Sequence, residues 1–215
     1  FYYDRFDKNR QNAFTFKDYV EALNDFSESS TYKEDKDYWM EQISLIPPAP
    51  MLPLQKDPSV IRKPQFARIE KVIPKSEWNV LQKEAKKKGI TTSTLLCTAY
   101  ALVLGYWSNQ PELTINVTVF TRYPFNEGVT DIVGDFTSVI LLRVNLLGRS
   151  DFWKLASEIQ NQLMDALEHR HYDGMNVIRK IAEQAEMKEQ AVMPVVFTSL
   201  LFSMEEGDIV TIEDL

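Results

Sequence analysis

The sequence predicts an α/β or α+β fold, with a mixed sheet covered by helices, on three observations. Segments with the 3.6-residue spacing of helices alternate along the chain with short β-branched runs. One of these runs, residues 194–202, is almost wholly apolar, which is typical of a strand covered on both faces. The composition, 44% hydrophobic and 26% charged, is that of an ordinary globular protein.

Composition also argues against several classes of protein. The chain has 215 residues, which allows one large domain or two small ones. Its net charge of −7 does not favour nucleic acid or an anionic membrane, and no run approaches the roughly 20 apolar residues of a membrane span. A single cysteine, Cys97, excludes an internal disulfide, so we expect a cytoplasmic setting. Because the first residue is not Met, we expect a piece of a longer polypeptide.

Two helices and a proline-rich segment are predicted at the N-terminal end. Apolar residues recur with helical spacing over residues 15–26 and again over residues 33–46. Repeated prolines exclude a helix over residues 46–54. This segment has apolar side chains to bury, so we expect it to lie pinned along a surface rather than to form a loose linker. They are Ile46, Met51, Leu52 and Leu54.

A strand and an amphipathic helix are predicted next. Residues 65–73 alternate between apolar and polar side chains, which indicates a half-exposed strand. Residues 76–88 follow as a helix, and Gly89 provides its C-terminal stop. The inner face of this helix is expected to carry Trp78, Leu81 and Ala85.

Residues 92–107 give the strongest helix prediction in the chain. They carry a wide apolar stripe, and Thr92 or Ser93 is suited to cap the first turn. We interpret Cys97 as a small core residue of this helix. The stripe consists of Leu95, Leu96, Ala99, Leu102, Val103 and Tyr106.

Residues 112–122 are predicted to form a strand with two different faces. The apolar face, expected to lie beneath helices, carries Leu113, Ile115, Val117 and Val119. The other face carries Thr114, Asn116, Thr118 and Phe120. Since only Phe120 is apolar there, this face is expected to line a channel or a wet interface. Asn116 either acts in that channel or bridges neighbouring strands.

The remaining elements alternate in the same way. A strand over residues 139–146 precedes a long helix, which Ser150 caps and which ends at Glu168. A further helix over residues 174–186 leads to the apolar strand at 194–202.

Two hydroxyls, Thr198 and Ser199, interrupt that last apolar strand. A buried hydroxyl costs about 1–3 kcal/mol unless it is hydrogen-bonded. The two side chains therefore either bond to nearby backbone or line a polar cavity. In a regular strand they point to opposite faces, so both cannot line one tunnel directly.

No common catalytic motif stands out. There is no nucleophile elbow, metal-ligand cluster, phosphate-binding glycine loop or useful pair of carboxylates. The only histidines are His169 and His171. Their segment loosely resembles the His-His-x-x-x-Asp-Gly motif of acyltransferases and condensation domains, but its spacing differs. We interpret it as the end of a helix, where His169 and Arg170 suit the helix dipole.

Five segments, taken in order, make the chain similar to the heterocyclization domains of nonribosomal peptide synthetases. They are LIPPAPMLPL at 45–54, TSTLL with AYALVL and WS within 92–108, NVTVF at 116–120, GDFTS at 134–138, and PVVFTS at 194–199. Each segment alone is weak, whereas the ordered set covers essentially the whole chain. GDFTS and PVVFTS distinguish this family from ordinary condensation domains.

The resemblance implies a fold and an activity. Such domains have two lobes that each resemble a chloramphenicol acetyltransferase subunit, with the active site in a tunnel between them. They join an upstream acyl group to Cys, Ser or Thr on a downstream carrier, and then cyclise and dehydrate the product to a thiazoline or oxazoline. The substrates ride on 4′-phosphopantetheine arms, so no cofactor bound by the domain itself is expected.

The resemblance also implies partners and an organisation. Residues 1–46 correspond to the last helices of the N-terminal lobe, residues 47–64 to a crossing segment, and residues 65–215 to a C-terminal lobe truncated at its end. The partners are the N-terminal lobe, the upstream and downstream peptidyl carrier proteins and an adjacent adenylation domain, with no nucleic acid or membrane. The Asp-x-x-x-x-Asp-x-x-Ser motif of the first lobe is absent, and we expect the chain alone to be inactive.

Three residues match functional positions of the family, and a fourth, Asp135, is a candidate by residue type alone. Thr198 corresponds to the cyclodehydration threonine, which relays a proton at the hydroxyl that leaves as water. Asn116 and Ser199 correspond to positions that affect cyclization, and we interpret Ser199 as a supporting residue. Asp135 is interpreted as fixing the loop before a strand through bonds to backbone. No metal or cofactor ligand is predicted.

Two other interpretations remain open at this point. One is an ordinary condensation domain that forms only a linear amide. The other is a non-catalytic lobe that docks carrier proteins.

Overall fold

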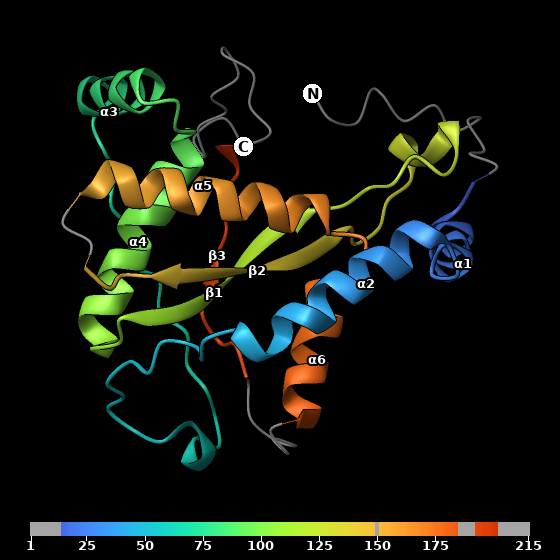
Figure 1. The fold of residues 1–215 in the computed structure, drawn as a ribbon, viewed down its shortest axis with the longest axis horizontal. Helices are drawn as coiled ribbons and strands as arrows, with labels where there is room; N and C mark the ends of the chain where they lie inside the picture. Colours follow the sequence, from blue (N-terminus) through green and yellow to red (C-terminus); the bar gives the residue numbers. More distant parts are fainter. Residues whose placement is uncertain (1–13, 149–150, 185–191, 202–215) are drawn as a thin grey trace.

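The structure is a computed structural model that describes residues 14–148, 151–184 and 192–201. In this part of the chain four α-helices precede two consecutive strands, and two further α-helices precede the last short strand (Figure 1). In order they are α1 (Phe16–Phe26), α2 (Ser30–Gln42), α3 (Lys75–Lys87), α4 (Thr92–Ser108), β1 (Glu112–Phe120), β2 (Thr137–Asn145), α5 (Phe152–Glu168), α6 (Gly174–Gln184) and β3 (Val196–Phe197). The predicted α/β class with a mixed sheet covered by helices is confirmed.

β1 is the central strand of a mixed sheet with the order β2-β1-β3. It pairs antiparallel with β2 along its whole length, from Glu112 opposite Asn145 to Phe120 opposite Thr137. It pairs parallel with β3 over two positions only, where Asn116 and Val117 face Val196 and Phe197. The long antiparallel pairing therefore forms the frame, and β3 is a short addition at its other edge.

The proline-rich segment continues the edge that β3 begins. The Thr114 amide donates to the Pro48 carbonyl at 3.0 Å, and the Thr114 hydroxyl donates to the Pro47 carbonyl at 2.6 Å. Two residues further on, the Asn116 amide donates to the Val195 carbonyl at 3.0 Å. The predicted pinning of residues 46–54 is thus confirmed at its first half, whereas Met51 and Leu54 remain exposed.

The apolar face of β1 lies beneath helices, as the alternation predicts. The residues directly opposite one another on β1 and β2 pair Leu113 with Val144, Ile115 with Leu142, and Val117 with Ile140. All six are buried and share one core with α4 and α5. Burial of each such side chain contributes about 1.5–3 kcal/mol, which makes this the main source of stability.

α5 and α6 pack on β2 from different sides (Figure 1). α6 approaches so closely that a Cβ added at Gly174 would lie 2.2 Å from the Val139 carbonyl oxygen. α2 joins the same core through Trp39, whose indole N–H donates to the His169 carbonyl at 2.9 Å. α2, assigned to a first lobe, thus shares the core of this sheet, while the division into lobes itself stays a prediction.

Two helix caps differ from the sequence prediction. The N-cap of α4 is Thr91, which accepts from the Thr94 amide, rather than Thr92 or Ser93. The N-cap of α5 is Asp151, which accepts from two amides of the first turn. Ser150 lies outside the described residues. In both cases neighbouring residues are all suited to the N-cap position, so the sequence alone does not determine at which of them the helix begins.

The buried face of α4 is also different from the predicted stripe. Val103 and Tyr106 are 54% and 81% exposed, and the buried face consists of Ser93, Thr94, Leu95, Cys97, Thr98, Ala101, Leu104 and Gly105. Small side chains allow the helix to approach the sheet closely, and the Thr98 hydroxyl is satisfied by the Thr94 carbonyl. Cys97 is fully buried, as predicted.

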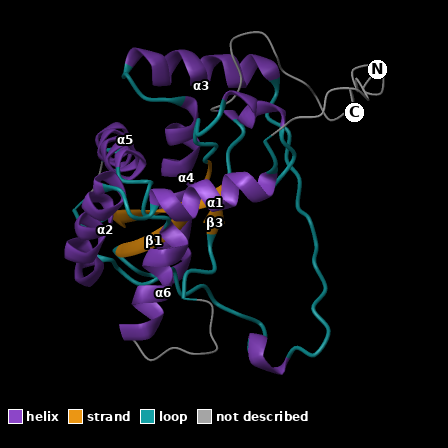
Figure 2. Cartoon of the chain, turned by 90° about the vertical axis from the view of Figure 1, so that its right-hand side faces the viewer, coloured by secondary structure: helices purple, strands orange, loops and turns teal. Residues whose placement is uncertain are grey.

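The predicted strand at 65–73 is wrong for the described chain. These residues have no strand partner, and Phe66 and Ile69 are 95% and 97% exposed. Figure 2 shows them within a long loop between α2 and α3 that projects away from the sheet. Alternation tells which side chains would share a face, but it does not supply a neighbouring strand to pair with. Leu81 of α3, predicted to lie inside, is likewise 38% exposed.

The prediction of a last strand covered on both faces is also wrong. β3 is an edge strand of two residues, and Val196 and Leu200 are 46% and 63% exposed. Within the described residues no strand pairs with its outer edge, and Phe202 lies outside them. An apolar run indicates what a strand tends to bury, but not whether both faces are covered.

No single helix among the described residues is long and apolar enough to cross a membrane. α3 and α4 together reach the necessary length and composition, but they are bent by 100° at the break between them.

Candidate functional site

The hydroxyls of Thr198 and Ser199 both bond to hydroxyls from other elements. Thr198 Oγ1 lies 2.8 Å from Thr118 Oγ1 on β1. Ser199 Oγ lies 2.8 Å from Ser93 Oγ at the start of α4, and it accepts from the Leu201 amide at 3.3 Å. The two hydroxyls thus bond to different elements, and both residues follow β3 (Val196–Phe197) rather than lie within it. Side-chain partners from β1 and α4 satisfy both groups, and Ser199 in addition bonds to nearby backbone, which is one of the two alternatives that the sequence left open.

Asn116 lies on the same face of β1 as Thr118, two residues before it, and it is 5% exposed. Its side-chain N–H donates to the Met193 carbonyl at 2.6 Å, which ties β1 to the residues before β3. Its Oδ1 atom is buried without a hydrogen-bond partner. Because a buried acceptor of this kind normally finds a donor, it is the one atom of Asn116 left for a further interaction.

The expected wet face of β1 is only partly wet. Thr114 and Asn116 are buried, because the proline-rich segment and the Met193 carbonyl cover them. The face opens only at its end, where Thr118 is half-buried and Phe120 is 58% exposed. The reactive part of this face is therefore limited to the surroundings of Thr118.

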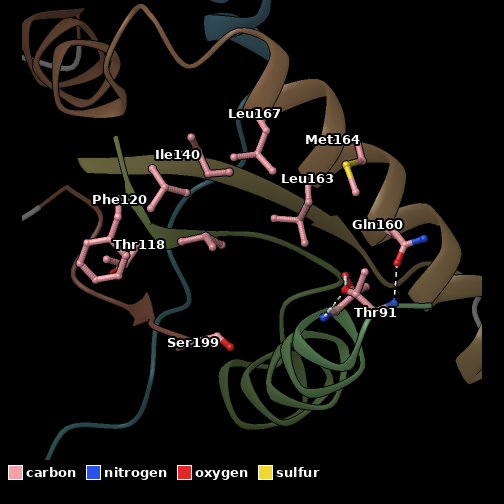
Figure 3. A pocket seen from close by; sticks show the side chains of 12 residues that line it. Thr91, Thr118, Phe120, Ile140, Gln160, Leu163, Met164, Leu167 and Ser199 are labelled. Atoms are coloured by element: carbon pink, nitrogen blue, oxygen red, sulfur yellow. Dashed lines mark hydrogen bonds between the residues drawn. The ribbon is translucent and has the colours of Figure 1, made fainter. Parts of the chain in front are cut away.

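A pocket of about 330 Å³ opens at that end of the strand (Figure 3). β1 lines it from Val117 to Phe120, beyond most of the β3 pairing, and Ser199 lines it from the opposite side. The remaining lining comes from β2, α5 and the start of α4, through Thr91, Thr94, Ile140, Gln160, Leu163, Met164 and Leu167. Most of this lining is apolar.

Asp135 does not belong to this group. Its carboxylate accepts from the Thr137 amide at 2.9 Å and so fixes the loop before β2, as the sequence indicates. These bonds from Thr137 hold the pKa of Asp135 below its usual value. Asp135 lines a different, smaller cavity of about 130 Å³ with Tyr123 and His171.

The two histidines are held by structural contacts. His169 stacks on Tyr38 with ring centroids 3.6 Å apart. The His171 ring and backbone amide both contact a carboxylate oxygen of buried Asp35, each at 2.9 Å. The same ring stacks on Tyr123, whose pKa is raised to about 12 by burial. These contacts agree with a segment that ends a helix rather than a catalytic motif.

Thr118 and Ser93 are the site residues that sequence reasoning did not single out. The sequence does indicate Thr118, because it follows Asn116 by two residues and residues two apart on a strand share a face. No local pattern indicates Ser93, because its partner Ser199 lies 106 residues away in the chain. Within the described residues, no group of three acidic, cysteine or histidine side chains gathers as a metal site would require.

Hydroxyl pairs define what the site can do. Thr198 and Thr118 each keep acceptor capacity beyond their mutual bond, and one proton of the pair remains free to donate. The pair can therefore hold or pass a proton at an oxygen of a bound group. Among the described residues neither hydroxyl bonds to a carboxylate or imidazole, so the pair offers polarisation and proton relay rather than a strong base.

Comparisons with known proteins agree with this fold and site. The sequence profile of the family described as Condensation domain matches residues 2–210. Bacitracin synthase 1 of Bacillus licheniformis is 44% identical over 189 residues, and phenyloxazoline synthase MbtB of Mycobacterium tuberculosis is 30% identical over 191. These alignments cover 87% and 88% of this chain, but 4% and 13% of the relatives.

Solved structures lead to the same family. The EpoB NRPS cyclization-docking bidomain from Sorangium cellulosum superimposes with a TM-score of 0.77 at 35% identity, over 86% of this chain and 38% of the bidomain. The chain belongs to the condensation-domain family, and its resemblance to the heterocyclization branch of nonribosomal peptide synthetases is confirmed. It spans less than half the length of each relative compared.

Proposed function

We propose that the chain is part of a heterocyclization domain. In that role it helps to condense a carrier-bound acyl or peptidyl thioester with carrier-bound Cys, Ser or Thr, and to dehydrate the product to a thiazoline or oxazoline. The single observation that carries the proposal is the hydroxyl pair of Thr118 and Thr198, which stands where the matching PVVFTS segment meets β1. The names of two relatives, a phenyloxazoline synthase and a cyclization bidomain, support the same activity.

In this proposal Thr198 holds the carbonyl-derived hydroxyl that leaves as water. Thr118 orients the Thr198 hydroxyl, and Asn116 supports the local backbone through Met193. Such proton transfer by a positioned side chain typically contributes about 10²–10⁴-fold. Ser199 shapes the neighbouring pocket, and Asp135 acts only through its loop.

The proposal includes partners. The substrates arrive on 4′-phosphopantetheine arms of the upstream and downstream carrier proteins, next to an adenylation domain, in the cytoplasm. No cofactor held by the chain itself is part of the scheme. Because positioning two tethered reactants can supply about 7–11 kcal/mol of a barrier, the chain on its own is proposed to be inactive.

The test is to load the full domain and its flanking carriers with donor and with Cys, Ser or Thr, and to weigh the released product. A mass one water below the linear amide supports heterocyclization. A linear amide alone would assign the chain to amide-forming condensation domains, and absence of both products would favour a carrier-docking role.

A further inference from the structure

The pocket that Thr118 lines is mostly apolar, and the function proposed above assigns it no ligand. We propose that it receives the apolar side chain of the carrier-borne acyl donor, and so selects the donor. This inference rests on the function proposed above, and it adds a substrate class that the hydroxyl site does not specify.

The floor of the pocket is fully apolar. Val117, Ile140 and Leu163 are 2%, 2% and 5% exposed and come from β1, β2 and α5. At the rim Met164 and Phe120 are 48% and 58% exposed, so the pocket is reached past two large, adaptable side chains (Figure 3). A volume of about 330 Å³ falls at the lower end of ligand pockets, which suits one side chain rather than a whole peptide.

The polar side chains of the lining are already bonded to protein. Gln160 accepts from the Thr91 amide at 2.8 Å and donates to the Gly89 carbonyl at 2.8 Å. Thr91 and Thr94 bond to each other at 2.7 Å. The remaining hydroxyls are those of Thr118 and Ser199, each paired as described above. No lining group therefore demands a polar occupant, and an apolar group gains by leaving water.

The position of the pocket identifies the donor as its occupant. Thr118 lines the pocket and its hydroxyl bonds to Thr198, so the pocket adjoins the proposed reacting centre through Thr118. The acceptor residue in the proposed reaction is Cys, Ser or Thr, whose small heteroatom side chain is consumed in the ring. At most one methyl group of the acceptor stays outside the ring, so of the two reactants only the donor can present a side chain large enough to fill an apolar pocket of this size.

A donor series tests the proposal in the full domain with its carriers. Glycyl, valyl, leucyl and phenylalanyl donors are compared by total product, linear plus cyclised. The intact domain is expected to prefer leucyl over glycyl by at least tenfold, since each methylene in such a pocket changes selectivity by about 10–200-fold. Met164→Trp should abolish that preference, because it lowers leucyl transfer far more than glycyl transfer.

Met175→Trp is the matched control, because Met175 is 43% exposed on α6 and does not line the pocket. Its leucyl preference should match that of the unmodified domain. Titration of the same domain with leucyl and glycyl N-acetylcysteamine thioesters provides a binding readout that needs no turnover, and the leucyl compound should bind more tightly only where Met164 is intact. Equal binding and equal transfer of all donors, or an equal loss for all donors in Met164→Trp, would overturn the proposal. A linear product with full donor preference would instead overturn heterocyclization alone.

Discussion

At the scale of single residues, the hydroxyl of Thr198 is the sharpest test of the chemistry. Thr198→Ala removes one member of the Thr118–Thr198 pair and leaves the backbone of β3 unchanged. Ring formation is expected to fall by about 10²–10⁴-fold while linear amide accumulates. The measurement is the ratio of cyclised to linear product in the carrier-loaded domain.

Thr198→Ser is the matched control, because it keeps the hydroxyl and loses only a methyl group. It should retain most of the ring formation. Thr118→Val tests positioning, and it should lower the ratio of cyclised to linear product less than Thr198→Ala does. An unchanged ratio in Thr198→Ala would show that this threonine is only a satisfied hydroxyl at a sheet edge.

Cys97 gives a second prediction at this scale. Its thiol is fully buried, and burial raises its pKa to about 12 from an ordinary value of 9.0. The folded chain keeps the thiol protonated, whereas the unfolded chain ionises it above about pH 9. The contribution of Cys97 to the free energy of unfolding is therefore fully present below pH 9 and is lost as pH rises toward 12. A disulfide reagent at pH 8 should therefore label Cys97 only as fast as the chain unfolds.

Labelling rates measured over a urea series provide the check for Cys97. They should follow the unfolding transition seen by circular dichroism. Rapid labelling of the native chain would mean that α4 opens locally far more often than its packing implies.

At the scale of elements, the contact between α6 and β2 depends on the absence of a side chain. In Gly174→Ala the new methyl would meet the Val139 carbonyl, which is backbone and cannot swing away. We expect a loss of about 1–3 kcal/mol in the free energy of unfolding, measured by urea denaturation. Gly89→Ala is the comparison, because Gly89 has positive φ but open space around it. Equal losses in the two variants would show that the close contact at Gly174 costs no more than the positive φ at Gly89.

The elements that sequence predicts well are those that carry their own signal. The helix ending at Phe26, the paired strands β1 and β2, and α5 follow from spacing, capping and turn chemistry within each segment. The Asp135 loop belongs to the same class, because its bond to Thr137 spans two residues.

The features that could not be predicted from the sequence depend on contacts with distant parts of the chain. Residues 65–73 have the alternation of a strand but no neighbour, and β3 is paired at one edge only. The buried face of α4 is the one with small side chains that pack closely on the sheet, and a hydrophobicity pattern does not identify such a face. Likewise, Thr198 was identified from a motif, whereas its partner Thr118 becomes evident only when β3 is placed beside β1.

At the scale of the whole molecule, the chain exposes a large amount of apolar surface. Phe66, Ile69 and Val72 are 95%, 97% and 84% exposed, and Tyr106 and Trp107 of α4 add aromatic area. Exposed apolar side chains of this size favour association. We therefore expect the isolated 215-residue chain to self-associate as its concentration rises, which light scattering would measure.

A triple variant with Ser at positions 66, 69 and 72 is expected to shift the association to higher concentration, since these side chains contact little of the core. Circular dichroism of the variant should remain unchanged. A clean monomer of the unmodified chain at high concentration would contradict the expectation.

The edge of β1 that faces β3 also has a consequence for the order of folding. Pro48 and Val195 bond to that one edge from distant parts of the chain, and the Thr118–Thr198 bond closes a separation of 80 residues. β1, β2 and α5 follow one another in the chain and can pair as soon as they leave the ribosome. Long loop closures are slower than such local pairing. We therefore expect the proposed reacting hydroxyls to meet late in folding, so slow maturation should affect the proposed activity before it affects secondary structure.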